Sequence, residues 1–395
     1  MMLKTNFFFN KYNTTLFLGF IFTFISLGII ANEPLEADSV ILNEHTAEAH
    51  VSTENHEADN KFNAGKLITE HIGDSHQWHL WGDHGHGVHV PLPVILWTDK
   101  GLELFSSSRV EHHDDIYKGS HYSYKLHDEH IEIVDEFGVV NEEASSKIVD
   151  LSITKNVFSL LFSAALMLWM FLTVAKSYSK RQGQAPKGLQ SFVEPFIMFI
   201  RDDIAKNSIG EKKHAKYLPY LLTIFFFIFI NNLLGLVPII PGGANLTGNI
   251  SVCLVLSALT LIIVLVSGNG HYWRHIFAMP GVPIPVLIIL TPIEIIGIIL
   301  RPFVLMIRLF ANITAGHIIA LAFFSLIFIF GEMNTGAGFG VAVVSVLFTV
   351  FMGMLELLVA FLQAYVFTLL SAIYIGAAVE EGHHDHHGEE AHAHH

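Results

Sequence analysis

Long apolar runs without a single charge fill the C-terminal two thirds of the chain. The first of them lies between Lys155 and Lys176, where 20 consecutive residues carry no charge. About 20 apolar residues suffice for one helix to cross a bilayer. Residues 217–273 also lack Lys, Arg, Asp and Glu, and this stretch is too long for one helix. The Pro- and Gly-rich segment 238–245 divides it, so we predict two spans with a turn between them.

Three further uncharged runs, at 309–331, 333–355 and 357–379, follow towards the C-terminus. The Gly-rich segment 331–340 predicts a turn between two long helices. Residues 189–205 differ, because charged and apolar residues alternate there as in a helix that lies in the membrane interface. The pattern therefore predicts an all-α polytopic membrane protein with about five spanning helices and one interfacial helix.

The N-terminal part has a different pattern. Residues 33–65 are polar and without apolar periodicity, which is typical of a flexible segment. Short apolar runs at 88–97, 122–124 and 131–134 are bounded by Gly, Asp and Asn, as β-strands are. We expect residues 66–150 to form a small β-containing domain.

Composition and charge support this division and orient it. Of 395 residues, 52% are hydrophobic and 15% charged, as in a polytopic membrane protein. Residues 33–150 hold 24 Asp or Glu against 7 Lys or Arg, and 14 of the 25 histidines. Residues 176–216 hold nine Lys or Arg, which marks a cytoplasmic loop. Alternating spans then place the acidic N-terminal extension outside the cytoplasm and the C-terminus inside.

The chain divides into four regions on this basis. Residues 1–31 are predicted to be a signal peptide, since Lys4 and Lys11 precede an apolar run; an uncleaved membrane anchor is the alternative. The acidic, His-rich extension 32–150 follows, then the membrane domain 151–380 and a His-rich cytoplasmic tail 381–395.

Candidate catalytic chemistry is sparse. Cys253 is the single cysteine and lies in an apolar run, which excludes a disulfide framework and a Cys-based metal site. No Gly-rich phosphate loop, GxSxG or HExxH motif is present. We predict no cofactor, no structural metal and no nucleic-acid partner.

Arg308 is the most informative polar residue. A guanidinium stays protonated at any ordinary pH, and placing one at membrane depth costs roughly 3 kcal/mol on insertion scales. Glu294, Arg301 and Arg308 are spaced by seven and therefore share one stripe of a helix, which Asn312 extends by a turn. A fixed charge that can pair with a carboxylate and make it release a proton indicates ion translocation. For Arg301, an interfacial side chain that reaches the cytoplasmic surface is the alternative.

The predicted hairpin places polar residues of its two helices at matching levels. With a turn near Gly336, residues at one level should have numbers that sum to about 672, which pairs Arg308 with Gln363 and His317 with Glu356. A Glu opposite a titratable His is suited to proton relay. A hydrogen-bonded pair that only holds the two helices together is the alternative.

The segment Arg308-Leu-Phe-Ala-Asn-Ile-Thr-Ala-Gly-His317, with Glu294 upstream and Glu356 and Gln363 downstream, closely resembles subunit a of the F-type ATP synthase. The resemblance covers about residues 155–380 and includes Asn231-Asn-Leu-Leu-Gly-Leu-Val-Pro238. It implies a non-catalytic, proton-translocating stator subunit of the bacterial inner membrane. The implied partners are the c-ring, the b subunits and the lipid bilayer.

The resemblance also implies roles for individual residues. The arginine matching Arg308 faces the c-ring carboxylate, and the glutamate matching Glu294 lies toward the outlet path. The remaining matched positions line an inlet half-channel; here they are Asn312, His317, Glu356 and Gln363. Many bacterial members carry Glu and His in the opposite order to His317 and Glu356, and the exchange keeps one acid and one imidazole.

Two other classes of protein compete with this interpretation. A metal-cation transporter is suggested by the histidines of the extension, His76, His79, His84, His86 and His89, and by those of the tail. Such a protein should carry His, Asp or Cys ligands within its spans, whereas Arg308 would repel a cation. A receptor-like membrane protein is the third class, and no sequence feature favours it.

Overall fold

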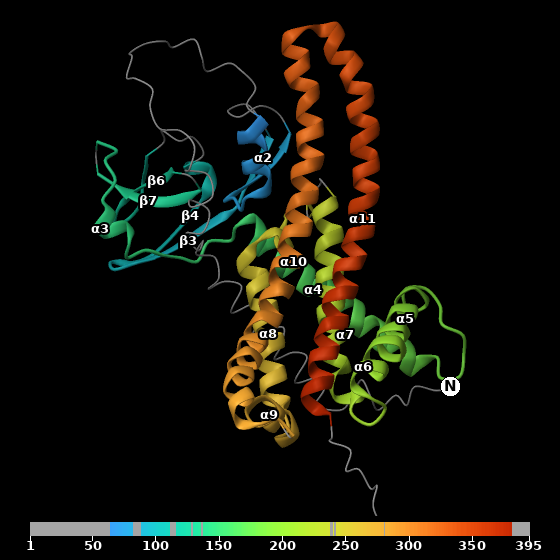
Figure 1. Ribbon diagram of the computed structural model, residues 1–395. Helices are drawn as coiled ribbons and strands as arrows, with labels where there is room; N and C mark the ends of the chain where they lie inside the picture. Colours follow the sequence, from blue (N-terminus) through green and yellow to red (C-terminus); the bar gives the residue numbers. More distant parts are fainter. Residues whose placement is uncertain are drawn as a thin grey trace, which may run out of the picture.

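The computed structural model describes residues 64–81, 88–110, 116–127, 129–135, 137–237, 240, 242–279 and 281–380. A small N-terminal domain, residues 64–154, lies beside a bundle of long helices (Figure 1). The predicted signal peptide, nearly all of the segment 33–65 that was predicted to be flexible, and the His-rich tail lie outside the described residues.

The N-terminal domain consists of three small antiparallel sheets and two short helices. Strands β4, β3 and β8 form one sheet, β5, β6 and β7 a second, and β1 pairs with β2. Alternate residues of the two larger sheets, among them Val94, Leu96, Tyr124 and Ile131, are buried in one small core. The element bounds are α2 Ala64–Ile72, β1 Gln77–Trp81, β2 Val88–Pro91, β3 Pro93–Thr98, β4 Gly101–Ser106, η3 Ser107–Arg109, β5 Tyr117–Lys118, β6 Ser123–His127, β7 His130–Val134, α3 Glu142–Ser145 and β8 Val149–Asp150.

The strands predicted at 88–97 and 131–134 are confirmed as β2, β3 and β7. Helix α2 and strand β1 are additions that the pattern of short apolar runs did not predict. Strand β8 ends four residues before the first membrane helix, so the domain is joined to the membrane part through a very short connection.

Five helices are long and apolar enough to cross a membrane, which confirms the predicted number. They are α4 Lys155–Lys180, α7 His214–Leu236, α8 Ile250–Ser267, α10 Ile284–Met333 and α11 Thr335–Val379. The predicted interfacial segment is α5 Leu189–Phe199, which continues as the π-helix η4 Ile200–Lys206 and the short α6 Asn207–Ile209. Short helices η5 Leu246–Gly248 and α9 Gly270–Phe277 flank α8.

Aromatic side chains hold the interfacial helix on the bundle. Phe196 of α5 lies within 6.4 Å, centroid to centroid, of rings on both α7 and α11. Phe225 and Phe229 of α7 pack edge-on against Phe361 of α11. Aromatic pairs in this geometry stabilise packing beyond their buried area, so this cluster fixes the position of α7 relative to the C-terminal hairpin.

The hairpin of α10 and α11 is longer than a bilayer is thick. Helix α10 has 50 residues, and at about 1.5 Å per residue it is about 75 Å long. A hydrocarbon core of about 30 Å can contain such an apolar helix only if it is steeply tilted. In Figure 1 the N-terminal domain lies on one side of the hairpin, and α5 and α6 lie on the other. A line drawn from the domain to α5 and α6 therefore runs across the long axis of the hairpin.

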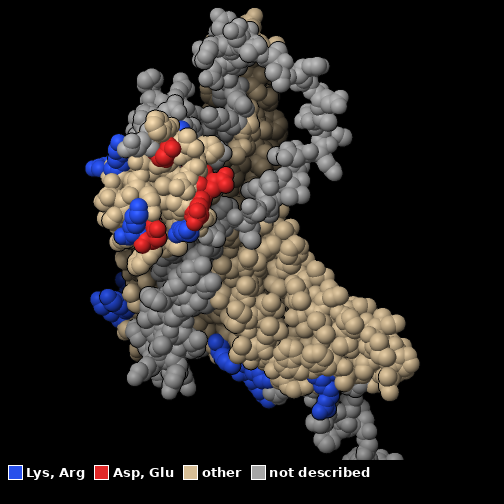
Figure 2. Space-filling model, turned by 90° about the vertical axis from the view of Figure 1, so that its left-hand side faces the viewer, with Lys and Arg blue, Asp and Glu red and all other residues tan. Residues whose placement is uncertain are grey.

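Charge is distributed as the sequence suggested. Seen from the side of the N-terminal domain, the acidic side chains in view gather on that domain, and the surface of the helices is largely uncharged (Figure 2). The apolar surface of the helices is therefore a surface for lipid or for other membrane subunits.

Candidate functional site

The register of the hairpin is the one that the sequence predicted. A Cβ built on Gly316 would lie 2.9 Å from Oε1 of Glu356, so these two residues are opposite one another. Further along, the rings of Phe323 and Phe348 are 3.8 Å apart. Both pairs have numbers that sum to 671 or 672. The same register places Gln363, which is buried, level with Arg308.

Arg308 lies on an exposed, apolar face of α10. Its side chain and that of Asn312, one turn further on, are both exposed. The neighbouring Val304 and Ile307 are 45% and 39% exposed. A permanent cation on a lipid-like surface needs an anionic partner, because leaving it unpaired in hydrocarbon costs several kcal/mol. The exposed guanidinium on this face is therefore suited to pair with an anionic group of another subunit.

His317 and Glu356 lie together at one level, on facing helices. The small residue Gly316 lets the Glu356 carboxylate approach the α10 backbone directly. In the described part of the chain, Oε1 of Glu356 is buried and has no hydrogen-bond partner. The His317 imidazole is turned toward α7, where its Nε2 is 3.8 Å from a Cβ built on Gly235. The acid and the imidazole thus lie at one level of the bundle, the acid against α10 and the imidazole toward α7.

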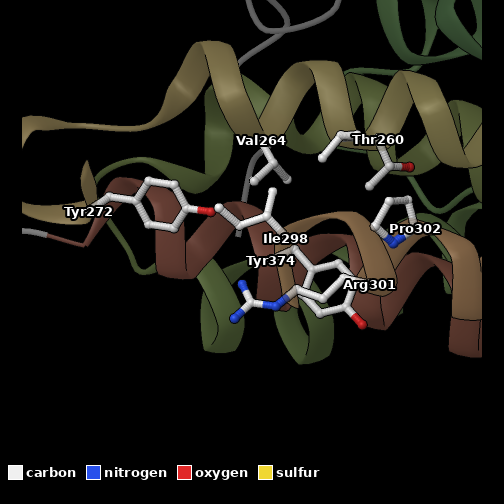
Figure 3. Close-up of a pocket in the computed structure, with 8 residues that line it drawn as sticks. Thr260, Val264, Tyr272, Ile298, Arg301, Pro302 and Tyr374 are labelled. Carbon is white, nitrogen blue, oxygen red and sulfur yellow. The ribbon is translucent and has the colours of Figure 1, made fainter. Parts of the chain in front are cut away.

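Glu294 and Arg301 lie toward the other end of α10. The Arg301 guanidinium stacks on the Tyr374 ring of α11 at 5.7 Å. Arg301 and Tyr374 line a small hollow between α8, α9, α10 and α11, together with Thr260 and Tyr272 (Figure 3). Burial raises the pKa of the Tyr272 phenol, the Arg301 charge opposes this, and Glu294 adds to it. Arg301 is therefore half-buried and in contact with α11.

Two sets of hydrogen-bonded, uncharged polar residues near these groups were not predicted from the sequence. The Tyr220 hydroxyl is 2.7 Å from Oγ1 of Thr260, which is 3.5 Å from Oγ of Ser371. Near the opposite end of α7, Thr247 donates to Asn232 and Asn232 donates to the Ala360 carbonyl. Thr, Ser and Asn within apolar runs were the available signal, but these residues are common in helices, and only the packing shows which of them meet.

Metal ligation finds little support in the described residues, where no group of three or more His, Cys, Asp or Glu could hold an ion. His84, His86 and the tail histidines lie outside that part of the chain.

Comparison with known proteins assigns the family. The ATP synthase A chain family matches residues 157–376, more than half of the chain. The chain belongs to the ATP synthase A chain family. It is a multi-pass membrane subunit that is not catalytic by itself. Residues 67–151 match a separate domain of unknown function, DUF8433.

Several bacterial relatives named ATP synthase subunit a are similar over most of their length. The protein of Chloroherpeton thalassium is 43% identical over 252 residues, which are 62% of this chain and 71% of the relative. That of Chlorobaculum tepidum, subunit a 2, is 46% identical over 253 residues, or 62% and 69%. That of Chlorobium luteolum, also subunit a 2, is 39% identical over 292 residues, or 72% and 81%.

Proposed function

We propose that this A chain conducts protons through two half-channels and that Arg308 separates them. The observation that carries the proposal is the exposed guanidinium on an otherwise apolar face of a membrane helix. A rotating ring that presents a carboxylate to this face supplies the missing partner. The c-ring of the membrane sector is that ring, and the b subunits complete the stator.

The inlet half-channel uses the level of His317 and Glu356. A proton from outside passes these two groups and then Gln363 and Asn312, and it neutralises a ring carboxylate. The neutral carboxylate can leave the Arg308 charge and enter the lipid at low cost. The transmembrane potential drives this flow with about 2.3 kcal/mol per charge per 100 mV.

The outlet half-channel begins near Glu294 and Arg301. When the protonated carboxylate completes its circuit, the Arg308 charge favours the ionised form and the proton leaves on this side. Arg308 also prevents a direct leak, because a fixed cation repels a proton that moves between the half-channels.

Replacement of Arg308 tests this function. Arg308→Ala and Arg308→Lys should both abolish proton-driven ATP synthesis in membrane vesicles while the complex still assembles. Lysine keeps the charge but loses the bidentate geometry, and it can deprotonate when desolvated. Arg181→Ala removes a half-buried arginine, which donates to the Lys187 carbonyl, from the loop after α4 and serves as the control. Normal synthesis in the Arg308→Lys vesicles would refute the proposed role of the guanidinium.

The orientation of the chain forms part of the proposal. The N-terminal domain lies outside the cytoplasm, in the periplasm of a cell with an inner membrane, and the tail lies inside. Ser108→Cys places a thiol on the exposed surface of the domain, unlike the neighbouring Ser107, which is buried. An impermeant thiol reagent added to intact cells should label Ser108→Cys and leave Ala391→Cys unlabelled. Labelling of the tail would reverse the orientation.

A further inference from the structure

The N-terminal domain is attached to the first turn of α4 by a half-buried carboxylate. Thr154 caps the helix, and its hydroxyl donates to Oδ2 of Asp74 at 2.8 Å. The amide of Asn156 donates to Oδ1 of Asp74 at 3.0 Å. An aspartate that accepts from the first turn of a helix is favoured by the helix dipole. The domain and the start of α4 therefore form one rigid unit at this point.

Lys155 is buried at the same junction. It is 7% exposed, and its Nζ donates to the carbonyl of His71, near the end of α2, at 3.4 Å. The charges that act on it are Asp74 and Glu129 of the domain. Helix α2, whose residue His71 accepts from Lys155, packs against α10, and Glu356 of α11 lies against Gly316 of α10. The junction that holds Lys155 therefore borders the helix that carries the proposed inlet residues.

A second cluster holds Glu129 in place. The buried His76 ring lies 3.2 Å from Oδ2 of Asp150, and its backbone amide donates to Oε2 of Glu129 at 3.2 Å. Among the described residues, Glu129 is the only non-glycine residue with a positive φ, 63°. A conformation of this kind persists only where the surroundings enforce it. The fold therefore fixes the position of the Glu129 carboxylate.

Buried polar atoms without a protein partner lead from this junction to the proposed inlet. A buried polar atom of this kind requires a water molecule as its partner. Within the described residues, six of these unpartnered atoms lie on α4, on α7, before η5, and on α10 and α11. Helices α4 and α7 pack against each other and against η5, and α10 and α11 pack against each other. The six atoms are Oδ1 of Asn156, Oγ of Ser159, Oδ1 of Asn231, Nδ2 of Asn245, Oγ1 of Thr314 and Oε1 of Glu356.

We propose that the outer section of the proton inlet runs as a hydrated path along the first turns of α4, beneath the N-terminal domain, with Asp74 and Lys155 as a charged pair at its mouth. This inference rests on the proposed function. The N-terminal domain then forms the outer wall of the inlet. Asn156 and Ser159 line the path, and Lys155 and Asp74 act as positioning residues that balance the charge next to His317.

Thiol accessibility tests the path directly. In a Cys253→Ser background, Asn156→Cys and Ser159→Cys each place one thiol on the path, and Met167→Cys places one on a buried apolar position two turns deeper on α4. Silver ions added from the side of the N-terminal domain should block proton-driven ATP synthesis severalfold faster at 156 and 159 than at 167. Equal rates at all three positions would overturn the proposal.

Charge substitution tests the role of Asp74 and Lys155 at the mouth of the proposed inlet. Asp74→Asn keeps an acceptor for the first turn of α4 but leaves Lys155 without its nearest anion, so proton-driven synthesis should slow severalfold. The double variant Asp74→Asn, Lys155→Met should recover most of the loss, which a general weakening of the fold would not allow. Lys147→Met, at an exposed site of the same domain, is the control. Slowing that the second substitution does not relieve would contradict the charge-pair role.

The same vesicles separate this inference from the function on which it rests. If Arg308→Ala abolishes synthesis while all three thiols react alike, the inlet lies elsewhere and the stator function stands. If Arg308→Ala retains synthesis, the proposed function itself fails.

Discussion

The N-terminal domain and the α10–α11 hairpin treat their polar groups in opposite ways. In the domain, several charged side chains are paired: His76 contacts two carboxylates, and Glu103 accepts from the amides of Ser120 and His121, although the buried Tyr124 hydroxyl has no hydrogen-bond partner. In the hairpin, polar residues are few, Arg308 is exposed among apolar residues, and one oxygen of Glu356 lacks a protein partner. A polar group that is fully paired within its own chain serves stability, whereas one that is left open is available to a moving proton or to another subunit.

The largest expected effect concerns the hairpin, where polar groups lack partners within the described chain. Gly316→Val would place a side chain where Oε1 of Glu356 now lies, 2.9 Å from the added Cβ. The flexible Glu356 side chain can move aside, so assembly should persist. We expect proton-driven synthesis to fall by about tenfold or more, since a displacement of about 1 Å at a reacting group costs up to roughly a hundredfold in enzymes.

Gly340→Val is the control for this prediction, because a Cβ at Gly340 meets no atom within 4 Å. Both substitutions add the same side chain to a helical glycine of the hairpin. Equal losses in the two variants would show that bulk in the hairpin, rather than the position of Glu356, is responsible.

The next effect concerns the coupling of His317 and Glu356. His317→Glu alone brings two acids to one level, so one of them is forced to remain protonated. The double exchange His317→Glu, Glu356→His restores one acid and one imidazole and should recover activity. A double-mutant cycle on the rate of proton pumping should give a coupling of roughly 0.5–3 kcal/mol, as for groups that share one network. Single defects that simply multiply would mean that the two residues work apart.

A smaller, pH-dependent effect is expected on the stability of the N-terminal domain, where charged side chains are paired. Burial would lower the pKa of His76, but the hydrogen bonds and charges of Asp150 and Glu129 outweigh burial and raise that pKa to about 9. A raised pKa in the folded state stabilises the domain fully below about pH 6.5, and this stabilisation is lost as the pH rises through 9. The loss is at most about 3 kcal/mol.

Hydrogen exchange of the β3 and β8 amides in the purified complex measures this loss. Protection, corrected for the intrinsic pH dependence of exchange, should fall between pH 6.5 and 10 in the natural chain. His76→Gln should already be low at pH 6.5 and should change little with pH. The same pH profile in both chains would mean that His76 carries no charge in the folded domain.

The smallest effect is expected at an exposed pair. Lys147 and Glu143 form an ion pair of 2.9 Å at i and i+4, but their side chains are 57% and 87% exposed. Pairs of this kind contribute about 0.3–0.5 kcal/mol. Lys147→Met should leave exchange protection and ATP synthesis nearly unchanged, and a loss as large as that of His76→Gln would contradict the distinction between buried and exposed pairing.

The hairpin could be predicted from the sequence because short stretches of the chain are enough to define its two helices and the turn between them. Charge-free runs define the helices, and antiparallel symmetry about one turn paired Glu356 with His317, one residue from Gly316, which it faces in the structure. The direction of the His317 ring toward Gly235 could not be predicted, because it depends on how α7 packs. The contact between Asp74 and α4 could not be predicted either, since its partner Asn156 is 82 positions away along the chain and acidic residues are abundant in the domain.

The steep tilt of the hairpin has an electrical consequence. If α10 covers about 30 Å of depth with its 50 residues, each residue advances only about 0.6 Å along the field. The nine residues from Arg308 to His317 then differ by about 5 Å in depth, yet lie about 13 Å apart along the helix. In depth, Arg308 and His317 are therefore much closer together than they are along the helix. Because water in the proposed half-channels has a high dielectric constant, the membrane potential would fall mainly across the dry section between them, around Arg308, and a short section of this kind would carry a strong field.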